Sequence, residues 1–156
     1  MRIKLTVTIV ALLIWTNGFA QDVNDNKAFT EATKGLVGEW VNELGSPLKI
    51  TSIDLSSGRI SGFYKSSSGT SGKSYPLIGW VNYQIPGQEG DNAVVVSFSV
   101  HWGEYGSVTT WNGTYRPQST SPEIKTQWLL VRSNSKFEWD HTHIGSSTFV
   151  PKTEAR

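Results

Sequence analysis

The stretch AVVVSFSVHW, residues 93–102, decides the fold because apolar and polar side chains alternate along it with a period of two. In an extended strand, one face would carry Val94, Val96, Phe98, Val100 and Trp102. The opposite face would carry Ser97, Ser99 and His101. Such alternation is typical of a strand that lies with one face in the protein core.

Similar segments lie on both sides of this stretch, separated by clusters of Gly, Ser, Asn and Pro. We expect strands at residues 36–42, 47–53, 59–65, 75–83, 93–102, 107–115, 123–131 and 142–150. No segment shows a convincing helical period. Eight short strands joined by tight turns predict an all-β protein, either an eight-stranded antiparallel up-and-down barrel or a sandwich.

Tryptophans recur along these strand-like runs, at Trp40, Trp102, Trp111, Trp128 and Trp139. The period of two places Ser107 and Thr109 on the same face as Trp111, and Thr126 on the same face as Trp128. A barrel of about eight strands is either filled by side chains or holds one small ligand. Buried hydroxyl groups need partners, so this pattern favours a barrel that holds a small ligand.

The ends of the chain differ from its centre. Arg2 and Lys4 precede an apolar run over residues 5–15, and Gly18-Phe19-Ala20 offers a small-x-small cleavage site. These features predict a secretory signal peptide over residues 1–20, and therefore a secreted or periplasmic protein. We expect an N-terminal arm at 21–34, a barrel at 35–150 and a polar tail at 151–156.

The composition of the chain argues against some classes of binding partner. The formal net charge is +1, and no basic stripe of the kind that holds phosphates is present, so a nucleic-acid partner is not expected. The apolar run at 5–15 is too short to cross a bilayer and no later run is longer, so no membrane partner is expected. The chain has no cysteine, so no disulfide stabilises it.

Several motifs, taken in order, resemble the avidin/streptavidin family. They are GEWVNELGS at 38–46, GFYKS at 62–66, VHW at 100–102, SVTTWNG at 107–113, TQWLL at 126–130, and Trp139 followed by GSSTF at 145–149. The resemblance covers roughly residues 35–150 and is to secreted biotin-binding proteins of bacterial type. It implies an eight-stranded barrel that binds biotin at one open end, with no catalytic activity and no cofactor.

The resemblance also implies a set of ligand-binding residues. They are Asn42, Ser46, Tyr64, Ser66, Thr70, Phe98, Trp102, Ser107, Thr109, Trp111, Trp128, Leu130, Trp139 and Ser147. By resemblance, the first three donate hydrogen bonds to the ureido oxygen of biotin and Ser66 accepts one from a ureido N–H. Thr109 approaches the ring sulfur, and three tryptophans form an apolar box around the ring. The carboxylate meets Ser107 and the backbone near Thr70, in a lid at residues 66–74.

Two positions depart from the family pattern. Ser147 stands where an Asp or Asn usually accepts the second ureido N–H, and Phe98 stands where another Trp is common. Trp139 matches a residue that closes a neighbouring subunit's site in tetrameric relatives. The match at Trp139 therefore implies a homotetramer. The serine hydroxyl at 147 is shorter than an Asp or Asn side chain, so the departure there implies a weaker contact with the second ureido N–H.

Other functions fit parts of the pattern. The same barrel can carry a different small ligand, and an extracellular carbohydrate-binding module also uses tryptophan side chains. A glycosidase would need two carboxylates in one cleft, and nothing in the sequence pairs them. His141 and His143 share a predicted strand face, as metal ligands do, but no third ligand is evident.

Overall fold

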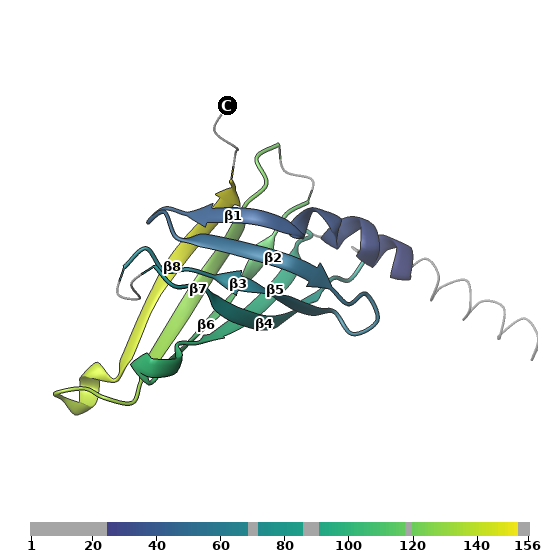
Figure 1. Ribbon diagram of the computed structural model, residues 1–156. Helices are drawn as coiled ribbons and strands as arrows, with labels where there is room; N and C mark the ends of the chain where they lie inside the picture. Colours follow the sequence, from purple (N-terminus) through teal and green to yellow (C-terminus); the bar gives the residue numbers. More distant parts are fainter. Residues whose placement is uncertain (1–24, 69–71, 86–90, 118–119, 153–156) are drawn as a thin grey trace, which may run out of the picture.

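The computed structural model describes residues 25–68, 72–85, 91–117 and 120–152. In this part, eight antiparallel strands form a closed barrel in which each strand pairs with the next and β1 pairs with β8 (Figure 1). The strands are β1 (Gly38–Asn42), β2 (Pro47–Ile53), β3 (Arg59–Tyr64), β4 (Tyr75–Asn82), β5 (Val94–His101), β6 (Ser107–Tyr115), β7 (Ile124–Arg132) and β8 (Thr142–Pro151). The eight-stranded up-and-down barrel is therefore confirmed, whereas the predicted signal peptide lies outside the described residues.

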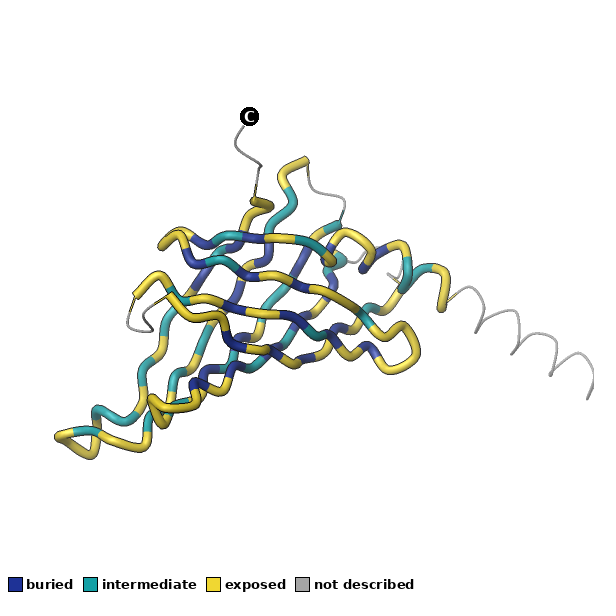
Figure 2. Tube along the Cα trace, viewed as in Figure 1, coloured by how far each residue is buried: buried dark blue, intermediate teal, exposed yellow. Residues whose placement is uncertain are grey.

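Side-chain alternation builds the core. The apolar face of β5 is buried in the barrel from Val94 to Val100, and every second residue of β4 is buried too (Figure 2). Closure leaves no unpaired strand edge, so backbone hydrogen bonds run around the whole barrel. A continuous hydrogen-bonded sheet around an apolar core explains how a chain without cysteine holds this fold.

The structure corrects one expectation. Residues 25–33 form a helix, followed by the 3-10 turn η1 (Lys34–Leu36), where the sequence indicated a loose arm and no helix. The segment buries Ala32, Thr33 and Leu36, and Trp40 Nε1 donates to the Leu36 carbonyl at 3.0 Å. Burying a side chain such as that of Leu36 stabilises the fold by about 1.5–3 kcal/mol. The helix lies at one end of the barrel (Figure 1).

The other end carries the connections β1–β2, β3–β4, β5–β6 and β7–β8. The β5–β6 connection contains η2 (Gly103–Tyr105), and the β7–β8 connection contains η3 (Glu138–Asp140) and projects beyond the barrel (Figure 1). Lys73 Nζ lies 2.7 Å from Glu104 Oε1, which ties the β3–β4 connection to η2. This contact lowers the pKa of the Glu104 carboxyl. Neighbouring connections therefore support one another at this end.

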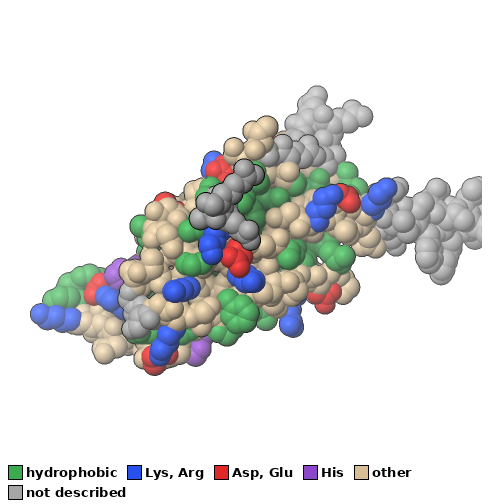
Figure 3. Space-filling view, turned by 45° about the horizontal axis from the view of Figure 1, so that its top comes forward, with side chains coloured by type: hydrophobic (Ala, Val, Ile, Leu, Met, Phe, Trp, Pro, Cys, Tyr) green, Lys and Arg blue, Asp and Glu red, His purple; other side chains and the backbone are tan. Residues whose placement is uncertain are grey.

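The outer surface has mixed charge. On the face in Figure 3, Lys and Arg side chains are interspersed with Asp and Glu. Several form exposed ion pairs, such as Lys49 with Glu39 at 3.1 Å. Within the described residues, no helix has the length and apolar character needed to span a membrane.

Candidate ligand-binding site

A cavity of about 580 Å³ lies inside the barrel at the end that carries the β7–β8 connection. Its lining combines hydroxyl, amide and aromatic side chains from strand interiors and from the connections. The lining residues are Asn42, Leu44, Ser46, Tyr64, Ser66, Ser68, Trp102, Tyr105, Ser107, Thr109, Trp111, Trp128, Leu130, Arg132, Asn134 and Ser147. A cavity in which aromatic and apolar walls surround convergent polar groups is typical of a small-molecule site.

One wall of the cavity is a polar cluster built around Asn42 at the end of β1. Asn42 Oδ1 accepts from the backbone N–H of Leu44 at 3.1 Å and of Ser46 at 2.8 Å. These bonds orient the amide, so that its Nδ2 donates to Ser147 Oγ across a longer 3.4 Å. Ser46 Oγ in turn accepts from the backbone N–H of Ser67 at 3.0 Å. The tight β1–β2 turn therefore presents an amide donor and a hydroxyl to the cavity.

Tyr64, the last residue of β3, completes the cluster. Burial raises the pKa of its hydroxyl, a hydrogen bond with Ser46 offsets part of this rise, and the charge of Glu43 adds to it. The hydroxyl is therefore protonated at neutral pH and can donate a hydrogen bond. Asn42, Ser46 and Tyr64 thus bring three potential donors to one wall.

Aromatic rings form the facing walls. Trp102 and Trp111 meet edge to face at 6.5 Å, and Tyr64 contacts both rings. Trp102 Nε1 donates to Thr109 Oγ1 at 2.7 Å, which fixes the indole and leaves the Thr109 hydroxyl hydrogen available to a ligand. Phe98 stacks behind Trp111 at 5.0 Å and 15°.

The position of the Trp128 side chain depends on Gly145, its neighbour on β8. Trp128 pairs in register with Gly145, and a Cβ at Gly145 would lie only 2.3 Å from Trp128 Cζ2. The absence of a side chain at Gly145 therefore lets the indole lie against the backbone of β8. Trp128 also borders a second hollow of about 510 Å³ on the outer face of β6–β8.

The structure brings most of the predicted site residues together. Those that line the cavity are Asn42, Ser46, Tyr64, Ser66, Trp102, Ser107, Thr109, Trp111, Trp128, Leu130 and Ser147. Phe98 is 1% exposed and supports Trp111 from behind, and Trp139 is 77% exposed in η3, away from the cavity lining. Thr70 lies outside the described residues.

Five further lining residues were not predicted: Leu44, Ser68, Tyr105, Arg132 and Asn134. Four of them lie on connections, where no strand period fixes the direction of a side chain. Arg132 is the last residue of β7, on the same face as Trp128 and Leu130. The strand period could have found it, but the sequence placed the end of this strand one residue earlier.

The residues that line the cavity argue against two of the alternative functions, a sugar-binding module and a glycosidase. Trp102 and Trp111 are buried inside the barrel, whereas a sugar-binding platform needs a solvent-exposed row of tryptophans. No Asp or Glu is among the described residues that line the cavity, so this lining offers no carboxylate pair of the kind that glycosidases use. His141 Nδ1 and His143 Nε2 contact different groups, the Arg132 carbonyl at 2.8 Å and the Asp140 carbonyl at 3.2 Å.

Comparison with known proteins agrees with this geometry. The model of the Avidin family matches residues 30–152. Among solved structures, the crystal structure of xenavidin matches with a TM-score of 0.61 and 29% sequence identity, over 75% of this chain and 97% of that one. Since the family model covers the whole barrel with its cavity, this chain belongs to the avidin family.

Proposed function

We propose that this protein binds biotin non-covalently in the open end of its barrel, one molecule per chain, and that it is not an enzyme. The observation that carries the proposal is the convergence of Asn42, Ser46 and Tyr64 on one wall of a cavity that tryptophans line. Biotin has a matching distribution of groups: a ureido carbonyl, two ureido N–H groups, an apolar thioether ring and a carboxylate on an aliphatic tail.

The donors suit the ureido oxygen. The Tyr64 and Ser46 hydroxyls and the Asn42 amide can each donate to it, and preorganised donors in a water-poor site polarise such an oxygen strongly. The Ser46 hydrogen that bonds Ser67 Oγ at 3.1 Å would turn to the ligand. The ring would lie between Trp111 and Trp128, with the Thr109 hydroxyl beside its sulfur.

We further propose a homotetramer in which Trp139 closes the site of a neighbouring subunit. Trp139 is 77% exposed and stacks on Phe137 at 4.7 Å and 6°, on a connection that projects beyond its own barrel. Leu129 and Ile144 are exposed on the outer face of β7 and β8 and border the outer hollow. Exposed apolar surface of this kind favours contact with another chain.

The proposed location follows from the N-terminal sequence alone. We expect cleavage of the signal peptide after Ala20, which leaves a mature chain that is secreted or periplasmic. Mass spectrometry of the exported protein tests this, because the mature chain should begin at Gln21.

Calorimetric titration of the mature protein with biotin tests the main proposal. We expect tight binding at one biotin per chain, and light scattering on the same sample should give the mass of four chains. A folded protein that shows no binding would contradict the biotin proposal and favour a carrier of a different small ligand, with Ser147 and Phe98 as the first positions to change.

Ser147→Asp should slow biotin dissociation by about fivefold, because a carboxylate accepts the second ureido N–H better than a hydroxyl and a hydrogen bond is worth about 1 kcal/mol. The side chain is buried beside Asn42 Nδ2, which would help to orient the new carboxylate. Competition with unlabelled biotin measures the rate. Ser147→Ala is the matched control and should shift the rate in the opposite direction; equal rates for both variants would exclude a ligand contact at this position.

Gly145→Ala should weaken biotin binding by about fivefold. The new methyl group would lie 2.3 Å from Trp128 Cζ2, so the indole must shift into the cavity, and overpacking of this kind costs about 1 kcal/mol or more. Calorimetry gives the affinity, and tryptophan fluorescence reports the displaced ring. Unchanged affinity together with an unchanged spectrum would show that Trp128 does not depend on this glycine.

A further inference from the structure

Arg132 is a charged residue at the mouth of an otherwise uncharged cavity. It ends β7 and pairs in register with Ser107, the first residue of β6, and both side chains line the cavity. Among the described lining residues, it is the only Asp, Glu, Lys or Arg. A single fixed cation at the entrance of an otherwise uncharged site points to a ligand with a negative charge at one end.

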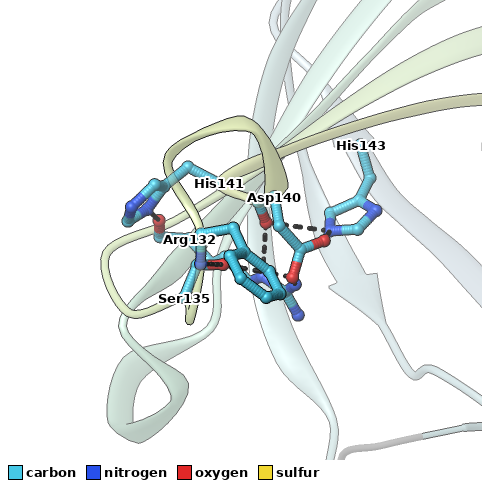
Figure 4. A network of polar contacts seen from close by, with 6 residues as sticks. Arg132, Ser135, Asp140, His141 and His143 are labelled. Carbon is cyan, nitrogen blue, oxygen red and sulfur yellow. Dashed lines mark hydrogen bonds and ion pairs between the residues drawn. The ribbon is translucent and has the colours of Figure 1, made fainter.

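The guanidinium is held in place by the β7–β8 connection (Figure 4). Its Nε donates to the Asp140 carbonyl at 2.9 Å, and its Nη2 forms an ion pair with the Asp140 carboxylate. Ser135 Oγ donates to the same carboxylate at 3.1 Å, and His143 Nε2 lies 3.3 Å from it. These contacts fix the direction of the Arg132 side chain before any ligand arrives.

The Asp140 contacts leave part of the guanidinium available. Arginine has five N–H donors, and the two contacts with Asp140 use two of them. The Arg132 side chain keeps 36% of its surface exposed, so the remaining donors can reach the cavity mouth and water. The Asp140 carboxylate offsets some of the positive charge of Arg132. We therefore expect Arg132 to have a moderate rather than a large effect on the affinity for an anionic ligand.

The path along β7 leads from the ring site to this cation. Trp128, Leu130 and Arg132 lie on one face of the strand, and Trp128 is about 13 Å from Arg132 along it. A ring bound at Trp128 with an aliphatic tail along Leu130 would bring a terminal carboxylate to Arg132 and Ser107. Resting on the proposed biotin function, we infer that Arg132 is a specificity residue that selects ligands with an anionic tail.

The test compares biotin with biotinamide, in which a neutral carboxamide replaces the carboxylate. Calorimetry gives both affinities for the unaltered protein, Arg132→Gln, Arg132→Lys and Arg116→Gln. Arg116 is a matched control because it forms an exposed ion pair with Asp91, just beyond the opposite end of β6. We expect the preference for biotin over biotinamide to fall about tenfold in Arg132→Gln, less in Arg132→Lys, and not at all in Arg116→Gln.

Other outcomes would overturn the inference in distinguishable ways. If Arg132→Gln keeps the full preference, or weakens both ligands equally, Arg132 does not select the carboxylate, although biotin binding itself stands. If circular dichroism shows that Arg132→Gln does not fold, the neutral variant Arg132→Met takes its place, and a full preference for biotin in that folded variant overturns the inference. If neither ligand binds the folded, unaltered protein, the proposed biotin function fails and the inference fails with it.

Discussion

Tyr64→Phe is expected to weaken biotin binding by about tenfold to hundredfold while the barrel stays folded. The substitution keeps the ring that contacts Trp102 and Trp111 and removes only the hydroxyl. A hydrogen bond lost in a buried site, with its partner left unsatisfied, costs about 1–3 kcal/mol. Calorimetric titration, or competition when binding is too tight, measures the change.

Tyr115→Phe is the matched control. Tyr115 is also buried, but it contacts Trp40 and ends β6 away from the cavity, so its hydroxyl should not affect biotin binding. Ser46→Ala removes a second donor from the same wall and should weaken binding as well. Unchanged affinity in both Tyr64→Phe and Ser46→Ala, with normal circular dichroism, would refute the donor assignment.

The fold could be predicted because strand alternation is a local signal. The burial of every second residue in β5 follows directly from the sequence of residues 93–102. The helix at 25–33 could not be recognised in the same way, because its segment is mostly polar and only a short stripe reaches the core. The apolar stripe of this helix is buried only because it contacts the end of the barrel. Such a contact between distant parts of the chain cannot be predicted from local periodicity.

The site could be predicted only where strand period or motif order fixes a side chain. The period gives the face on which Phe98 lies but not its depth along the barrel axis, so it could not tell that Phe98 lies behind Trp111. Tyr105 and Asn134 lie on connections, whose side-chain directions depend on turn geometry and on contacts between connections. Arg132 could have been predicted as a lining residue only if the expected end of its strand had been placed one residue later.

The Arg132–Asp140 pair also links the proposed ligand site to the proposed subunit contact. Asp140 follows Trp139 directly in η3, and its carboxylate contacts both Arg132 at the cavity mouth and Ser135 within the same connection. The polar network therefore holds the base of the projecting connection. The same connection carries the stacked rings of Phe137 and Trp139.

Trp139→Lys should reduce the assembly from four chains to two and speed biotin dissociation by about thirtyfold. A tryptophan that closes a neighbour's site is a typical interface hot spot, worth about 2 kcal/mol or more, and a lysine cannot fill the same apolar space. Since Trp139 is 77% exposed on its own chain, the substitution should not disturb the barrel. Light scattering gives the mass, and competition with unlabelled biotin gives the rate.

Leu55→Lys provides the control for this change, because it also places a lysine at an exposed apolar residue but lies in the β2–β3 turn. It should keep four chains and the original dissociation rate. If Trp139→Lys remains tetrameric with an unaltered rate, Trp139 does not reach another subunit's site. If the assembly falls to two chains while the rate stays unchanged, Trp139 serves the contact between chains alone, and each barrel retains biotin with its own residues.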